Sequence, residues 1–217
     1  MARRPEAKPQ RPAARLYLVT PRGKDPSVLA RTLDEMLDAA DVAAVLLRPH
    51  AGEERALIES IKAVAPVVQE RGVALLLDGH ADIVARANAD GAHLTGIDAF
   101  TAAFDRLKPD RIAGAGGLKT RHDAMLAAER GADYLMFGET DGGQPPFDEL
   151  VERVAWWAEL FELPCVGCAA SLDEVGALAA AGADFVALGD FVFSDSRGRS
   201  AMIRAAAERL SAPEPVK

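Results

Sequence analysis

The sequence predicts an α/β protein built as one (β/α)8 barrel, also called a TIM barrel. Short apolar runs that suit buried strands alternate with segments of helical spacing, and eight such pairs can be counted. A weak repeat supports the count, because Ala89-Asp90, Ala132-Asp133 and Ala183-Asp184 each stand between a helix end and an apolar run. The length of 217 residues lies near the lower end of the range for this fold.

The clearest unit runs from Val73 to Asp98. Val73–Leu77 is an unbroken apolar run, Asp82–Asn88 has helical spacing, and Ala92–Thr95 is apolar again. Strand, helix and strand in so short a stretch indicate two parallel strands. Each is followed by an acid, Asp78 or Asp98, and we expect both acids at the mouth where the carboxyl ends of the strands open.

The remaining elements follow the same two patterns. Pro21-Arg22-Gly23 ends the first strand, Gly72 caps the second helix, and Pro66 is expected to interrupt that helix. The other expected strands are Leu16–Thr20, Val42–Leu47, Ile112–Ala115, Asp133–Phe137, Cys165–Cys168 and Phe185–Leu188. The other expected helices are Val28–Ala39, Glu53–Arg71, Phe100–Leu107, Arg121–Arg130, Phe147–Phe161, Leu172–Ala181 and Ser200–Leu210.

The amino-acid composition limits where in the cell the protein is expected and which classes of partner it is expected to bind. Residues 1–15 are rich in Arg, Pro and Ala and are expected to be a disordered tail, residues 16–210 form the barrel domain, and 211–217 are a second tail. A net charge of −8 argues against nucleic acid and anionic membranes as partners. Two cysteines, no signal peptide and no membrane-length apolar run fit a cytoplasmic protein.

Three segments carry a resemblance to a known family: Asp82 to Leu94 (DIVARANADGAHL), Gly131 to Tyr134 (GADY) and Gly182 to Leu188 (GADFVAL). Over residues 16–210 the chain resembles the thiamine phosphate synthase and TenI family of (β/α)8 barrels. The resemblance implies a transferase that joins hydroxymethylpyrimidine diphosphate to a thiazole phosphate with release of pyrophosphate, with Mg²⁺ as its metal. The alternative within the family is a TenI-type thiazole tautomerase.

Several polar residues are expected at the mouth. Arg48 can grip an anion through two bonds or form an ion pair with an acid of the mouth. Asp78 and Asp98 can hold Mg²⁺ or cap the turns after their strands. His50 and His80 can carry protons near neutral pH or be structural, and Lys119 can bind an anion beside Gly116-Gly117 or face solvent.

The sequence departs from the family where it is expected to bind the thiazole phosphate. Ala169-Ala170 replaces a Gly-Gly pair after strand seven, and Asp190 replaces a serine after strand eight. Alanine crowds a ligand that approaches the backbone, and like unit charges ~4 Å apart cost several kcal/mol at an effective dielectric of about 20. Our hypothesis is a divergent member whose thiazole-phosphate site is damaged or repurposed.

Two further functions stay open. One is an enzyme that acts on a different small molecule with Asp78, Asp98 and His80. The other is a catalytically silent binding or regulatory barrel. Cys165 and Cys168 have redox spacing but are expected on opposite faces of a strand, and His93 is expected inside the barrel. An apolar helix carrying Trp156 hints at a homodimer.

Overall fold

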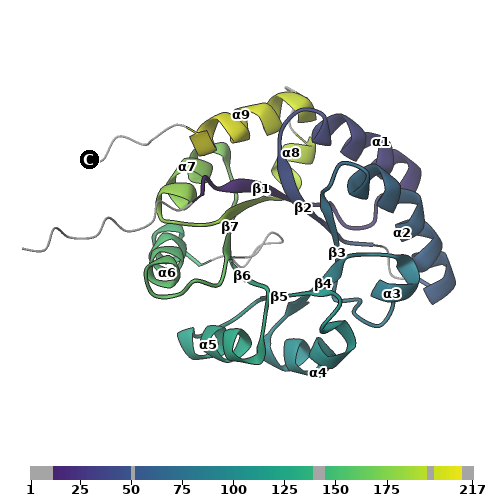
Figure 1. Cartoon of the computed structure of the whole chain (residues 1–217). Helices are drawn as coiled ribbons and strands as arrows, with labels where there is room; N and C mark the ends of the chain where they lie inside the picture. Colours follow the sequence, from purple (N-terminus) through teal and green to yellow (C-terminus); the bar gives the residue numbers. More distant parts are fainter. Residues whose placement is uncertain (1–11, 50–51, 139–144, 195–197, 212–217) are drawn as a thin grey trace, which may run out of the picture.

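The computed structural model describes residues 12–49, 52–138, 145–194 and 198–211, and it confirms the predicted barrel. Eight parallel strands close into a ring in chain order, and the helices surround it (Figure 1). The ring closes where β1 pairs with β8, with Leu16 beside Val186 and Leu18 beside Leu188. The strands are β1 Arg15–Val19, β2 Val42–Leu47, β3 Ala74–Asp78, β4 Gly91–Thr95, β5 Ile112–Gly116, β6 Tyr134–Phe137, β7 Cys165–Ala169 and β8 Phe185–Leu188.

The helices lie outside the strands and follow them in turn. They are α1 Pro26–Leu37, α2 Glu54–Gln69, α3 Val84–Ala87, α4 Ile97–Leu107, α5 Arg121–Arg130, α6 Phe147–Leu160, α7 Leu172–Ala180, α8 Asp190–Ser194 and α9 Arg199–Ser211. The short helix α8 was not predicted, and it separates β8 from α9. No helix of the described ranges is long and apolar enough to cross a membrane.

Two details of the predicted helices are wrong. The interruption expected at Pro66 does not occur, because α2 runs through it. Pro66 and Lys62 lie on the exposed side of α2, so the carbonyl that loses its N–H partner there can bind water. Helix α4 begins at Ile97, three residues before the predicted Phe100, and so Asp98 stands in its first turn and not at a strand end.

Two apolar clusters stabilise the fold. The larger fills the layer between strands and helices, and the smaller fills the barrel interior. Cys165 belongs to the first and Cys168 to the second, which confirms that the two thiols face opposite sides of β7. Trp157 is buried, with its ring nitrogen donating to the Leu163 carbonyl at 2.8 Å, and the half-buried Trp156 lies under the Arg121 guanidinium.

The repeated aspartates tie neighbouring strands together at the amino end of the barrel. Asp90, Asp133 and Asp184 stand just before β4, β6 and β8. Their carboxylates accept the backbone N–H groups of Leu75, Ala113 and Cys165, on the preceding strands, at 2.7, 2.7 and 2.8 Å. The repeat seen in the sequence is therefore a structural clamp.

Candidate active site at the barrel mouth

Arg48 follows β2 directly and is the most deeply buried cation at the mouth. Its side chain is 2% exposed. Its backbone N–H donates to the Thr20 hydroxyl at 3.0 Å, and Nε donates to the Thr20 carbonyl at 2.5 Å. Its terminal nitrogen reaches Asp190 Oδ1 at 2.9 Å. Of the two roles that the sequence allowed, the structure shows the ion pair.

Asp78 is the last residue of β3 and makes the second ion pair of the mouth. Its side chain is 15% exposed, and Oδ2 lies 3.0 Å from a guanidinium nitrogen of Arg22. Arg22 comes from the loop after β1, so this pair joins the ends of two strands that are not neighbours in the ring. A half-buried carboxylate beside a guanidinium can take part in binding a metal or in orienting a cationic group.

The end of the mouth formed by β7 and β8 holds carboxylates. Ala169 is buried at the end of β7, and the N–H of Ala170 donates to Glu174 Oε2 at 2.6 Å. Asp190 opens α8 with a side chain that is 58% exposed. The predicted picture of Asp190 as a bare negative charge is incomplete, because Arg48 neutralises part of that charge.

A chain of polar side chains lies below the mouth, inside the barrel. Tyr17 and Tyr134 share a hydrogen bond of 3.0 Å between their hydroxyls, and His93 Nδ1 lies 2.9 Å from the Tyr134 hydroxyl. Burial lowers the pKa of His93 from 6.5 to about 4, although Asp78 raises it slightly, and so the ring is neutral at pH 7. Burial also raises the pKa of both tyrosines.

Two glycines of β5 make room for this chain. A Cβ on Gly114 would lie 2.1 Å from Cζ of Tyr134, and a Cβ on Gly116 would lie 2.5 Å from Nε2 of His93. The inward position of His93 was predicted, but its tyrosine partners were not. The alternation of glycines at 114 and 116, on one face of the strand, was the available signal.

The other predicted site residues take no part in these two ion pairs or lie outside the described residues. His80 is half-buried in the loop after β3, and Asp98 is exposed in the first turn of α4. Lys119 is exposed and lines a cavity of about 280 Å³ with Arg153 and Phe137. His50 lies outside the described residues.

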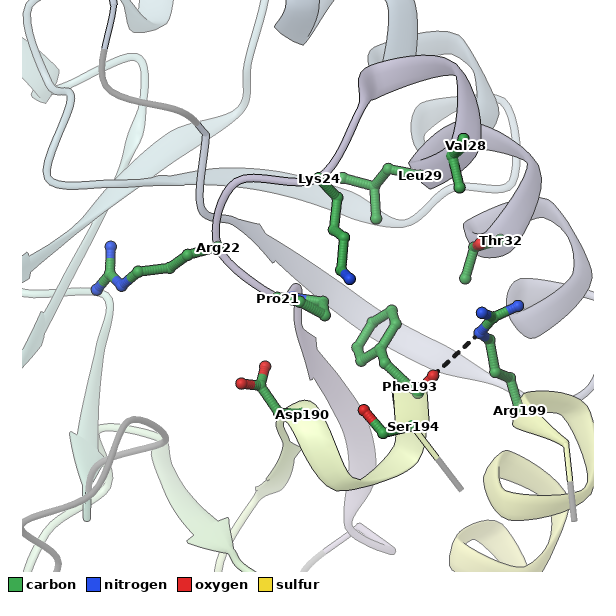
Figure 2. A pocket seen from close by; sticks show the side chains of 10 residues that line it. All are labelled: Pro21, Arg22, Lys24, Val28, Leu29, Thr32, Asp190, Phe193, Ser194 and Arg199. Carbon is green, nitrogen blue, oxygen red and sulfur yellow. Dashed lines mark hydrogen bonds between the residues drawn. The ribbon is translucent and has the colours of Figure 1, made fainter. Parts of the chain in front are cut away.

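A larger cavity of about 720 Å³ lies beside α8, between it, α1 and the loop after β1. Figure 2 shows the Lys24 side chain directed into this cavity and the Arg22 side chain directed away from it. Asp190 lies at its edge, and Arg199 closes the opposite side with Nε donating to the Phe193 carbonyl at 3.1 Å. Lys24 is not among the site residues predicted from the sequence.

The carboxylates of the mouth fit a Mg²⁺ site only if substrate phosphate oxygens supply the remaining ligands of the ion. Within residues 12–49, 52–138, 145–194 and 198–211, no group of three or more His, Cys, Asp or Glu side chains could hold a metal ion. Mg²⁺ is commonly bound through one or two carboxylates, waters and phosphate oxygens. Asp78, at its strand end, and Asp98, in the first turn of α4, would supply the protein ligands of such a site.

These features define a class: a (β/α)8 barrel with charged side chains gathered at the carboxyl ends of its strands. The model of the thiamine monophosphate synthase family matches residues 16–192, so the chain belongs to that family. The thiamine-phosphate synthase of Rhodospirillum centenum is 37% identical over 87% of this chain and 94% of its own. That of Hyphomonas neptunium is 36% identical over 90% and 93%.

Solved structures agree on the fold. The thiamine phosphate pyrophosphorylase of Pyrococcus furiosus superposes with a TM-score of 0.75 at 20% identity, covering 94% of this chain and 98% of that one. The 3-hexulose-6-phosphate synthase of Salmonella typhimurium gives a TM-score of 0.71 at 16% identity, covering 92% and 100%. At these identities the likeness concerns the barrel alone.

Proposed function

We propose that this protein is a transferase of thiamine biosynthesis, which joins hydroxymethylpyrimidine diphosphate to a thiazole and releases pyrophosphate. The observation that supports it is the match to the thiamine monophosphate synthase family, which covers the chain from β1 to α8. In the reaction a bond forms between the thiazole nitrogen and the pyrimidine methylene carbon. The carbon–oxygen bond to the diphosphate breaks, and its electron pair leaves with pyrophosphate.

The main electrostatic task is to stabilise charge on the departing pyrophosphate. Mg²⁺, when bound, supplies positive charge at those oxygens. Asp78 holds this ion in our proposal, and Asp98 contributes from α4. Arg22, 3.0 Å from Asp78, keeps that carboxylate oriented and places a second positive charge beside the leaving group. His80 follows Asp78 in the loop after β3, and in our proposal it also lies on the side of the mouth where the pyrophosphate leaves.

Release of pyrophosphate from the pyrimidine diphosphate tests the proposal, with Mg²⁺ and with the thiazole supplied either as phosphate or as alcohol. We expect release that needs both organic substrates and stops when EDTA removes the metal. Asp78→Asn should lower kcat/KM on the order of a hundredfold, because a neutral amide is a poor ligand for a hard cation.

Asp110→Asn is the matched control for this measurement. Asp110 is an exposed acid in the loop before β5, at the opposite end of the barrel, and its loss should leave kcat/KM unchanged. No release with either thiazole would refute the proposal. Equal activity of the Asp78 and Asp110 variants would refute the role of Asp78.

A cytoplasmic location also belongs to this proposal. Cys165 and Cys168 are buried thiols that are not joined in a disulfide, which agrees with a reducing compartment. Fractionation of the native cells, with the protein detected by antibody, would test it. Recovery with the periplasmic or membrane fraction would contradict it.

A further inference from the structure

The carboxyl ends of β7 and β8, together with the short helix α8, form one end of the mouth. Barrels of this fold often hold a phosphate group there, with backbone N–H groups and cationic side chains. One donor of each kind is bonded to a carboxylate there. They are the N–H of Ala170, just after β7, and the guanidinium of Arg48, which reaches across from β2.

Both donors are already bonded to carboxylates of the chain itself. The Ala170 N–H donates to Glu174 Oε2 at 2.6 Å, and Arg48 donates to Asp190 Oδ1 at 2.9 Å. Arg48 is held in this position by Thr20, whose carbonyl accepts from Nε at 2.5 Å. A phosphate would have to displace two carboxylates from their partners and remain beside them.

The second oxygen of Asp190 is a hydrogen-bond acceptor that is open to a ligand. Within the described part of the chain, Asp190 makes its one polar contact through Oδ1, and its side chain is 58% exposed. A carboxylate accepts but does not donate, and so it favours a ligand with an O–H group. A phosphate ester that is fully ionised near neutral pH has no such donor.

We propose that this end of the mouth binds the free hydroxyl of a thiazole alcohol and that Asp190 selects it against the phosphate ester. The inference rests on the proposed transferase function and names the form of its second substrate. The hydroxyl takes no part in the bond changes. Its proton stays on oxygen and is shared with Oδ2 of Asp190, and the product carries an alcohol where the phosphate ester would have given a monophosphate.

The test compares kcat/KM for pyrophosphate release with the thiazole alcohol and with the thiazole phosphate, using the full chain with Mg²⁺. We expect the wild-type protein to prefer the alcohol by about tenfold or more, the size of one hydrogen bond to a charged group. Asp190→Asn should raise kcat/KM for the phosphate by about tenfold. Its amide oxygen can still accept from Arg48, so the buried guanidinium keeps a partner.

Two further variants complete the comparison. Glu174→Gln keeps an acceptor for the Ala170 N–H while removing a charge, and it should also improve use of the phosphate. Asp173→Asn removes one charge from the same helix, but Asp173 is 89% exposed and paired with Arg209 at 3.0 Å. It should leave the preference unchanged and so serves as the control.

The outcomes separate this inference from the transferase function itself. A wild-type preference for the phosphate would overturn the inference and leave the function standing. If neither thiazole supports release, the function fails, and calorimetric titration with the two thiazoles decides the inference. Tighter binding of the alcohol would support it, and tighter binding of the phosphate, or binding of neither, would overturn it.

Discussion

Inside the barrel, the buried side chain of His93 is hydrogen-bonded to the side chain of Tyr134. Its ring lies 5.7 Å from that of Tyr134, nearly parallel to it, and Nδ1 shares a hydrogen bond with the Tyr134 hydroxyl. Below the mouth, the barrel therefore contains a buried polar chain among apolar side chains, and the neutral ring is the form that this position favours.

The stability of the protein should fall as the pH drops below 6.5. The pKa of His93 is about 4 in the folded chain against 6.5 ordinarily, so the unfolded chain binds more protons between these values. The contribution is fully present above pH 6.5 and is lost as the pH falls toward 4. By pH 5 the loss amounts to about 2 kcal/mol of the free energy of unfolding.

Urea unfolding of the wild type and of His93→Gln at pH 7 and pH 5 measures this contribution. The wild type should lose more free energy of unfolding between the two pH values than the variant loses. His122→Gln, at an exposed position of α5, is the control and should behave as the wild type does. An equal pH dependence in all three proteins would contradict the assignment.

Gly114 should tolerate no side chain. A Cβ there would meet the Tyr134 ring at 2.1 Å, inside a barrel that cannot expand locally. Gly114→Ala should cost about 3 kcal/mol or more of stability, or prevent folding. Gly52→Ala is the control, because nothing lies within 4 Å of a Cβ at Gly52. Thermal unfolding measures both, and similar midpoints would refute the packing argument.

At the scale of elements, the apolar runs located all eight strands because parallel strands are buried on both faces. Helix starts were less predictable. Helix α4 begins directly after Gly96, whose φ of 92° no other residue type adopts readily, and Asp98 thus belongs to the helix. Helix α8 was missed because its five residues are too few to show a helical period.

The aspartate clamp should contribute measurably to stability. Asp90 accepts from the Leu75 N–H at 2.7 Å and from the Gln69 amide at 3.0 Å. In Asp90→Ala the Leu75 N–H loses its acceptor, and we expect a loss of about 1–3 kcal/mol. Asp110→Ala, an exposed acid of another loop, should change stability by no more than about 0.5 kcal/mol. Equal urea midpoints for the two variants would show that the clamp is dispensable.

At the scale of the whole molecule, the ion pairs of the mouth are a product of closure. Arg48 and Asp190 are separated by 142 residues, and they meet because β8 closes on β1, which lies beside β2. The sequence placed each residue after its strand, since strand ends are local features. It could not tell which acid Arg48 would meet, because that depends on side-chain directions across the finished ring.

The same closure should make the barrel unfold as one unit. One apolar cluster includes residues from both halves of the chain, and β1 is bonded to β8. The two tryptophans, Trp156 and Trp157, are both in α6, so their fluorescence reports the second half, whereas circular dichroism reports all helices. The two signals should give one urea midpoint.

Asp90→Ala makes this test sharper, because Asp90 lies in the half without tryptophan. In a single cooperative unit it must lower the fluorescence midpoint as much as the circular dichroism midpoint. Asp184→Ala, which removes the acceptor of the Cys165 N–H in the second half, should likewise shift both signals together. If Asp90→Ala shifted circular dichroism alone, the two halves would be separate folding units and the closed ring would not be the source of cooperativity.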